Sequence, residues 1–309
     1  MIGTGGRTAP KAIVFATAAA VLTFALLGHE WIPDIAGSGA VLDAAVPWLG
    51  LLVPVLAVTA VLLRSPAGAV TMLVPLLAWA YVFGAWWAPR PAAATPGGGL
   101  TVVSQNLFAA NGSPVATARA LLSADADVVA VQEFAGSNRA PVQRILDDAY
   151  PYREQLGTVA LWSRYPTSDA EPADVGIGWT RGLRTRIAAP GGDVVAYVVH
   201  LPSIRPGESA GRDHGLAVLS RQLTGEPAER VLVAGDFNTA TTDRNWSGFA
   251  PGYRDALSAG GSGPGFTWPS SFPLVRLDHV LVRGGAVDSA SVLRTPGPDH
   301  RAVRATIGF

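Results

Sequence analysis

The sequence predicts an α/β domain that follows an N-terminal membrane domain. Nearly all of its excess hydrophobicity lies before residue 90, whereas short β-branched runs alternate with helical segments after residue 100. With 49% hydrophobic residues and a mean hydropathy of +0.29, the chain is more apolar than an ordinary soluble enzyme. Between the two parts, Ala88–Gly99 reads APRPAAATPGGG, which favours an extended, flexible tether. We therefore divide the chain into a membrane domain (1–90), a linker (91–100) and a folded domain (101–309).

Three uncharged runs in the first part predict three transmembrane helices: Ala12–Gly28, Ala44–Leu63 and Ser65–Pro89. A helix needs roughly 20 apolar residues to cross a bilayer core. The prolines in the second and third runs are compatible with this interpretation, because membrane helices accommodate proline. The first run could instead be the hydrophobic core of a signal peptide.

The positions of basic residues predict the orientation of these helices. Arg7 and Lys11 precede the first run, the loop His29–Asp43 has no lysine or arginine, and Arg64 lies between the second and third runs. Because basic residues mark the cytoplasmic side, we expect a multi-pass cell-membrane protein with an extracytoplasmic folded domain. This topology places four tryptophans at the outer membrane interface, which indole rings prefer: Trp31, Trp48, Trp86 and Trp87.

The folded domain shows seven β-branched runs of the length of buried strands. In order they are TVVSQNL, DVVAVQE, TVALWSR, DVVAYVVH, RVLVAGDFN, LDHVLV and RAVRATI. Helical segments are expected between them at Ser113–Ser123, Ala140–Ala149 and Ser209–Leu223. This alternation is typical of an α/β domain, in which functional side chains gather at strand ends.

Polar residues occupy those strand ends. They are Asn106, Glu133, His200, Asp236, Asn238, Asp278, His279, Asp299 and His300. Carboxylates and amides are hard oxygen ligands suited to Mg²⁺ or Mn²⁺, and histidines supply hydrogen-bond donors or bases for phosphoryl chemistry. The chain has no cysteine, which excludes disulfides, thiolate catalysis and zinc–thiolate sites.

Six motifs, in chain order, resemble those of the endonuclease/exonuclease/phosphatase superfamily. They are SQNL at 104–107, VQE at 131–133, HLPS at 200–203, GDFN at 235–238, RLDHVL at 276–281 and PDHR at 298–301. The resemblance covers residues 101–309 and implies a DNase I-like fold of two packed mixed β-sheets flanked by helices. It also implies a magnesium-dependent hydrolase of phosphoric ester or diphosphate bonds.

The same resemblance implies a metal site. Glu133 would hold the divalent cation, Mg²⁺ or Mn²⁺, with Asn106 and Asp299 near it. Asp299 would also pair with His300. Nuclease members usually have a further acidic residue between the VQE and HLPS motifs, and neither Glu154 nor Glu171 fits that position convincingly.

The resemblance further implies catalytic roles for five residues. Asp236 would orient or deprotonate the attacking water, and Asn238 would donate a hydrogen bond to a phosphoryl oxygen. His300 would stabilise the transition state or handle a proton, and His200 would act similarly from across the phosphate. Asp278 would orient His300 or a neighbouring ligand. Positioning and charge stabilisation of this kind carry most of phosphoryl-transfer catalysis.

Each motif taken alone has an ordinary structural explanation. GDFN can be a turn capped by its aspartate, PDHR a loop, and His200 a buried histidine of the core. We interpret His214 as a surface residue, while Arg205 could bind a phosphate or be solvated. Six motifs in family order favour an active phosphoesterase over a non-catalytic binding module of the same fold.

Charge and topology narrow the range of possible substrates. The chain has 23 basic and 23 acidic residues, so it lacks the basic excess of a nonspecific nucleic-acid binder, and an extracytoplasmic nuclease is the weaker alternative. A domain tethered to a bilayer meets lipid-linked phosphates at high effective concentration. The layout of three spans followed by this domain resembles VanJ-type teicoplanin-resistance proteins. We therefore expect the bilayer and a lipid-linked phosphate as partners, and no motif indicates a protein partner.

Overall fold

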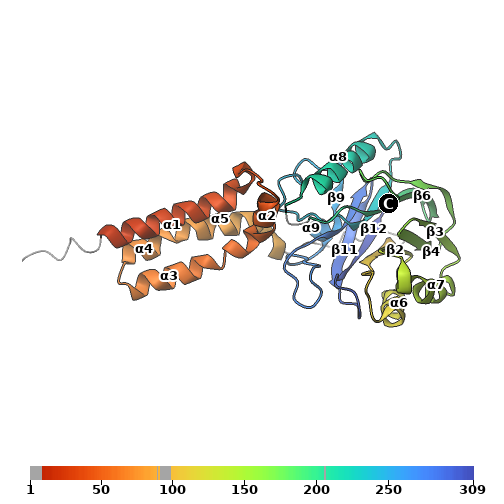
Figure 1. Ribbon diagram of the computed structural model, residues 1–309, viewed down its shortest axis with the longest axis horizontal. Coiled ribbons are helices and arrows are strands. Elements are labelled where there is room, and N and C mark those ends of the chain that lie inside the picture. Colours follow the sequence, from red (N-terminus) through yellow and green to blue (C-terminus); the bar gives the residue numbers. More distant parts are fainter. Residues whose placement is uncertain (1–8, 89, 91–98, 205–206) are drawn as a thin grey trace, which may run out of the picture. The chain divides into compact units, whose positions relative to one another are not determined.

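The computed structural model describes residues 9–88, 90, 99–204 and 207–309, and the chain forms two compact units (Figure 1). One unit comprises Met1–Ala88 with the short segment Thr242–Arg244; the other comprises Pro89–Thr241 and Asn245–Phe309. Arg7, Arg205 and residues 91–98 of the predicted linker lie outside the described residues.

The first unit is helical. Its elements are α1 (Ala9–Gly28), η2 (His29–Trp31), α2 (Ser38–Leu49), α3 (Leu52–Leu62), α4 (Pro66–Thr71), α5 (Leu73–Phe83) and η3 (Gly84–Trp87). Two continuous helical stretches, Pro10–Trp31 and Pro66–Trp87, are long and apolar enough to cross a membrane, with mean hydropathies of 2.0 and 1.7. Apolar side chains such as Phe15, Leu26 and Phe83 pack together inside this unit.

The predicted second span is a bent pair of helices rather than one straight helix. α2 and α3 meet at an angle of 58°, so the unit has two candidate spans, or three if the bent pair counts as one. Pro54 lies in the first turn of α3. It has no N–H to donate to the preceding turn and its ring crowds the carbonyl there, which explains a break at Gly50 and Leu51.

The second unit contains two six-stranded sheets, as the family resemblance implied. The first has the order β11-β12-β1-β2-β4-β3, formed by β1 (Leu100–Asn106), β2 (Val128–Gln132), β3 (Tyr152–Leu156), β4 (Val159–Ser163), β11 (Ala286–Leu293) and β12 (Ala302–Gly308). The second has the order β5-β6-β7-β8-β10-β9, formed by β5 (Thr167–Pro172), β6 (Gly182–Ala189), β7 (Gly192–His200), β8 (Val231–Asp236), β9 (Arg254–Asp255) and β10 (Asp278–Arg283). Both sheets are mixed, because β1 runs parallel to β2 and β7 runs parallel to β8.

The sheets pack face to face, with helices on their outer faces. Side chains from both sheets, among them Val102, Leu161, Val198 and Val280, form one buried core. On the outside, α6 (Pro114–Ser123) and α7 (Arg139–Asp147) cover the first sheet, and α8 (Ala210–Gly225) covers the second (Figure 1). The short elements η4 (Gly136–Asn138) and α9 (Ala256–Gly260) complete the unit.

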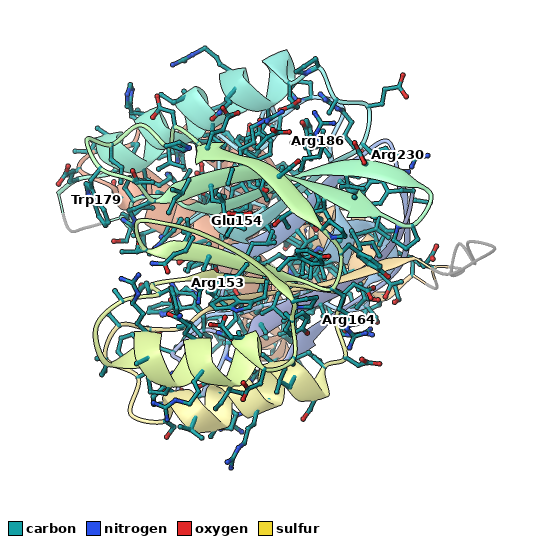
Figure 2. The ribbon with its side chains drawn as sticks, turned by 90° about the vertical axis from the view of Figure 1, so that its right-hand side faces the viewer. Arg153, Glu154, Arg164, Trp179, Arg186 and Arg230 are labelled. Atoms are coloured by element: carbon teal, nitrogen blue, oxygen red, sulfur yellow. The ribbon has the colours of Figure 1, made fainter. Side chains whose placement is uncertain are left out.

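Each of the seven predicted runs contains a strand, and each predicted helix overlaps α6, α7 or α8. The strands that the pattern missed are β3, β5, β6, β9 and β11. Four of them lie at sheet edges, and β6 lies next to one. Edge strands can expose a face to water, so they lose the continuous apolar pattern. Figure 2 shows charged side chains on these strands, including Arg153 and Glu154 of β3 and Arg186 of β6.

Candidate active site

Strand register brings three predicted site residues together on the second sheet. His200 ends β7 and pairs with Asp236 at the end of parallel strand β8, and Asp278 pairs with Asp236 from antiparallel strand β10. Residues that are directly opposite across neighbouring strands present their side chains to the same face of the sheet. All three are buried. The sheet therefore holds two carboxylates and one imidazole side by side.

The first sheet contributes Asn106 and Glu133. Asn106 ends β1, and its Nδ2 donates hydrogen bonds to Glu133 Oε1 (3.1 Å) and to Asp236 Oδ2 (3.0 Å). Asn106 thus links the polar ends of both sheets. Glu133, directly after β2, has a φ of 55°, and a non-glycine residue in this left-handed region costs about 1 kcal/mol or more. Such local strain is typical of functional positions.

His300 is oriented by Asp278. Its Nδ1 lies 2.9 Å from Asp278 Oδ2, and its Nε2 lies 3.9 Å from Asp236 Oδ2. Burial opposes the charged form of His300, but the Asp278 and Asp236 carboxylates outweigh it and raise its pKa. Without a bound metal ion, the two carboxylates therefore favour the charged form of the ring. Its Nε2–H is free to serve a ligand near Asp236, because the Asp278 bond occupies Nδ1.

Asp236 lies at the centre of the cluster. Its Oδ1 accepts a hydrogen bond from the backbone N–H of Asn238 (2.8 Å). Burial raises its pKa, against the lowering effect of His300. Asn238 itself has a φ of 49° and donates from Nδ2 to the carbonyl of Leu201 (2.9 Å), which fixes the turn after β8. This turn places the backbone N–H of Asn238 against the Asp236 carboxylate.

His200 is neutral. It contacts Arg181, an arginine that was not predicted as a site residue from the sequence. Burial lowers the pKa of His200 well below its ordinary value, and the nearby cations of Arg181 and His300 lower it further. Its Nε2 contacts the Arg181 guanidinium and lies 3.6 Å from Asp236 Oδ2. Arg181 directly precedes β6, and Gly182 pairs with Val199. Prediction of the β6–β7 pairing would have placed Arg181 opposite His200.

Asp236, Asp278 and His300 form a buried cluster that could hold a metal ion, with one ligand atom from each within 4.8 Å of the others. Asp278 Oδ1 is buried and has no hydrogen-bond partner among the described residues. An unsatisfied buried carboxylate oxygen is costly unless a ligand or water meets it. This cluster differs from the predicted metal set, although Glu133 and Asn106 border it.

Asp299 is placed differently from the prediction that it pairs with His300. Its Oδ2 accepts a hydrogen bond from Trp268 Nε1 (3.4 Å), while the His300 ring bonds to Asp278 instead. The Asp299 carboxylate still contributes to the raised pKa of His300, although less than Asp278 and Asp236 do. The consecutive residues Asp299 and His300 thus make separate contacts.

The remaining residues singled out in the sequence lie outside the cluster. His279 is fully buried, and its ring nitrogens face Asp255 Oδ2 and the carbonyl of Thr239, both at 2.9 Å. His214 is exposed on α8. Glu154 accepts a hydrogen bond from Thr167 (2.8 Å), and Glu171 pairs with Arg184 (3.1 Å), so neither supplies a further acidic group to the site.

Comparison with protein families gives one match over most of the folded unit. Residues 103–303 match the model described as the Endonuclease/Exonuclease/phosphatase family. The uncharacterized protein YbhP of Escherichia coli strain K12 is 32% identical over 140 residues, which cover 43% of this chain and 54% of that protein. YbhP of Shigella flexneri has the same identity and coverage. The chain therefore spans about half the length of the curated relatives it matches.

Several solved structures share the fold. Humanized TDP2 of D. rerio has a TM-score of 0.58 and 20% identity, covering 68% of this chain and 99% of that one. A mannosyl-6-phosphatase of Bacteroides thetaiotaomicron has a TM-score of 0.55 and 18% identity, covering 68% and 100%. Beta toxin of Staphylococcus aureus has a TM-score of 0.54 and 16% identity, covering 67% and 99%. Identities this low show the fold alone.

Proposed function

This chain belongs to the endonuclease/exonuclease/phosphatase family, and from that premise we propose that it is a metal-dependent phosphoesterase acting on a lipid-linked phosphate at the outer face of a membrane. One observation carries the catalytic part of the proposal: strand ends from both sheets converge on Asp236. That carboxylate is hydrogen-bonded by Asn106 and faced by His200 and by the Asp278–His300 pair.

The residues of the cluster fit a hard divalent cation. Carboxylate and amide oxygens are the donors that Mg²⁺ and Mn²⁺ prefer, and the Asp278 Oδ1 atom, buried without a hydrogen-bond partner among the described residues, supports a ligand at this cluster. We propose that Glu133 would hold Mg²⁺ or Mn²⁺ with Asn106 and Asp299 near it, as the family resemblance implies. Asp236 is linked to this set through Asn106 and to the Asp278–His300 pair through His300. When bound, such an ion would stabilise the negative charge on the phosphoryl oxygens.

Four side chains of the site would each have a separate role in hydrolysis of the phosphate. Asp236 accepts the proton of the attacking water or orients that water. The second N–H of the Asn238 side-chain amide, beside the one that donates to the Leu201 carbonyl, donates a hydrogen bond to a phosphoryl oxygen. His300, protonated and held by Asp278, donates from Nε2 to the charge that develops in the transition state. His200, neutral because it is buried, would stabilise the transition state or handle a proton from the other side of Asp236. These groups are preorganised before substrate binds, which is the main source of rate in phosphoryl transfer.

The candidate membrane spans support the choice of substrate. An enzyme anchored in a bilayer meets lipid-linked phosphates at high effective concentration, whereas a soluble nucleotide gains nothing from the anchor. The balanced charge of the chain also disfavours a nuclease, because DNA binding relies on an excess of basic residues.

Hydrolysis assays of the full-length protein in detergent test the proposal. Bis-p-nitrophenyl phosphate should be cleaved with Mg²⁺ or Mn²⁺, and EDTA should abolish the activity. A panel of phospholipids, prenyl diphosphates and DNA then identifies the substrate. We expect Glu133→Gln to lower kcat by roughly a thousandfold or more with folding intact.

Glu154→Gln is the matched control for Glu133→Gln, because it makes the same chemical change at a glutamate that bonds Thr167 outside the cluster. It should retain kcat within about threefold. Full activity in EDTA would remove the metal from the mechanism. Binding of phosphate compounds without hydrolysis by the metal-loaded protein would instead indicate a non-catalytic module.

A further inference from the structure

A charge-free loop in the second unit exposes large apolar side chains. No charged residue lies between Asp255 and Arg276. Within this stretch Trp268 is 39% exposed, Phe272 is 68% exposed and Leu274 is 38% exposed. We call Phe266–Val275 the aromatic loop. Large apolar groups that gather on one surface segment are unusual in a soluble domain and mark a site of contact with another protein, a ligand or a membrane.

The aromatic loop has its own regular hydrogen bonds. The backbone N–H of Trp268 donates to the carbonyl of Val275 (3.0 Å), and that of Val275 donates back to Trp268 (3.1 Å). The N–H of Leu274 also donates to the Trp268 carbonyl (2.8 Å). The loop is thus a closed hairpin, and its apolar side chains are presented without the entropy cost of ordering a loose segment.

Further hydrogen bonds hold the aromatic loop to the chain on both sides of His300. Ser270 donates from its backbone N–H to the carbonyl of Asp299 (2.6 Å) and from its hydroxyl to that of Pro298 (2.7 Å). On the other side, the N–H of Arg301 donates to the carbonyl of Thr267 (2.8 Å). The apolar side chains therefore project from a loop that is hydrogen-bonded to the segment that carries the proposed catalytic histidine.

We propose that the aromatic loop inserts into a lipid surface and so brings the phosphate of a membrane lipid to His300. Tryptophan and phenylalanine are favoured in the interfacial region of bilayers, and the absence of charge avoids a desolvation penalty on insertion. The candidate spans of the same chain would anchor the protein in a bilayer. The lipid contact is a separate surface from those spans, but its catalytic role rests on the proposed phosphoesterase function.

Site-directed labelling tests the insertion directly, and the cysteine-free chain makes it specific. The variant Phe272→Cys would carry an environment-sensitive fluorophore in full-length protein reconstituted into phosphatidylcholine–phosphatidylglycerol vesicles. Lipids with a quencher on the acyl chain should quench this probe strongly, since interfacial loops bury their apolar groups about 5–10 Å deep. Tyr152→Cys is the matched control, because Tyr152 is 36% exposed on edge strand β3. It should show no more quenching than free fluorophore.

A kinetic comparison tests the catalytic consequence. Phe272→Ser and Leu274→Ser should each lower kcat/KM for a long-chain lipid phosphate in vesicles by about tenfold or more, as expected for losing the burial of one large apolar side chain. The same variants should cleave bis-p-nitrophenyl phosphate within about twofold of the wild-type rate. Tyr152→Ser should leave both rates within this range.

The experiments distinguish a failure of lipid insertion by the aromatic loop from a failure of the proposed function. Equal, weak quenching at positions 272 and 152 would overturn lipid insertion. So would self-association of the detergent-solubilised protein that Phe272→Ser abolishes, because the loop would then bind a second copy. If wild-type protein cleaves no phosphate ester at all, the proposed function fails, while the quenching result still decides the lipid contact.

Discussion

The Nδ1 atom of His300 lies 2.9 Å from Oδ2 of Asp278, and both side chains are buried. The two residues come from separate segments of the chain and lie 22 positions apart. A carboxylate at this position fixes which ring nitrogen faces the reacting group and stabilises the imidazolium.

Loss of that carboxylate should impair catalysis without weakening ground-state binding. Asp278→Asn keeps the shape of the side chain but removes its charge, so we expect kcat to fall by about a hundredfold and KM to change less than threefold. Steady-state kinetics with bis-p-nitrophenyl phosphate measures both. A large rise in KM with unchanged kcat would show that Asp278 serves substrate binding instead.

His300 and Asp236 should act as a unit on one phosphoryl group. Their side chains approach to 3.9 Å, and both act on charge and protons that move in the transition state. We expect His300→Ala and Asp236→Asn each to lower kcat by roughly a thousandfold, and the double variant to lose far less than the product of the two. A double-mutant cycle measures this coupling. Multiplicative losses would assign the two residues to independent steps.

His279 should matter for stability rather than catalysis, although it is adjacent to Asp278 in the sequence. Its ring bonds Asp255 and the Thr239 carbonyl and lies 4.2 Å from the indole of Trp246, measured between ring centroids. We expect His279→Phe to leave kcat within about tenfold but to lower the melting temperature clearly, because at least one of these buried acceptors loses its donor at about 1–3 kcal/mol. Thermal melts and kinetics of the same preparation separate the effects. A kcat loss as large as that of His300→Ala would contradict this assignment.

Glu226 should make the folded unit sensitive to acid. Its buried carboxylate accepts hydrogen bonds from Arg184 (2.8 Å), Tyr197 (2.6 Å) and the backbone of Ala228 (3.0 Å). Burial alone would raise the pKa of Glu226, but these donors lower it from 4.5 to about 2. Because the folded pKa lies below the unfolded one, this stability is complete above pH 4.5 and is lost as the pH falls towards 2.

The shift corresponds to about 3 kcal/mol at neutral pH. Glu226→Gln should therefore lower the melting temperature at pH 7 and flatten its decline between pH 5 and pH 2. Glu171→Gln is the matched control, since Glu171 also pairs with Arg184 but is 58% exposed at its side chain, where an ion pair contributes at most about 1 kcal/mol. Equal effects of both substitutions would show that the buried network is not the source.

Membrane topology can be tested with reporter fusions. The pattern of Arg7 and Lys11, then no basic residue, then Arg64 predicts that the C-terminus lies outside the cytoplasm. Alkaline phosphatase fused after Phe309 should be active, whereas a fluorescent protein that matures only in the cytoplasm should stay dark there. The opposite pair of signals would place the folded domain in the cytoplasm.

The sequence predicted the central strands because burial on both faces requires continuous apolar runs. VVAVQ in β2 and VLVAGD in β8 are fully buried, and the runs that contain them identified these strands. The edge strands escaped prediction for the opposite reason. TSDAEP in β5 is almost entirely exposed, so its pairing with β6 rather than its side chains determines its conformation.

The residues of the candidate site stand out in the sequence for a related reason. Asn106, Glu133, His200 and Asp236 interrupt or directly follow apolar strands, and a polar residue in such a position is conspicuous in a linear pattern. Arg181 has no such signal, because it precedes the half-polar strand β6 and becomes part of the site only through its position opposite His200.

By itself, the sequence determined the apolar N-terminal helices, the strands of the sheet interiors and the chemical types of the site residues, because hydrophobic length and strand-end polarity are local properties of the chain. Only the tertiary structure decided which of these residues meet. Asn106 of one sheet donates a hydrogen bond to Asp236 of the other across 130 positions of sequence, and His300 bonds Asp278 rather than its neighbour Asp299. These choices depend on strand register and on how the two sheets pack, which are properties of distant segments together.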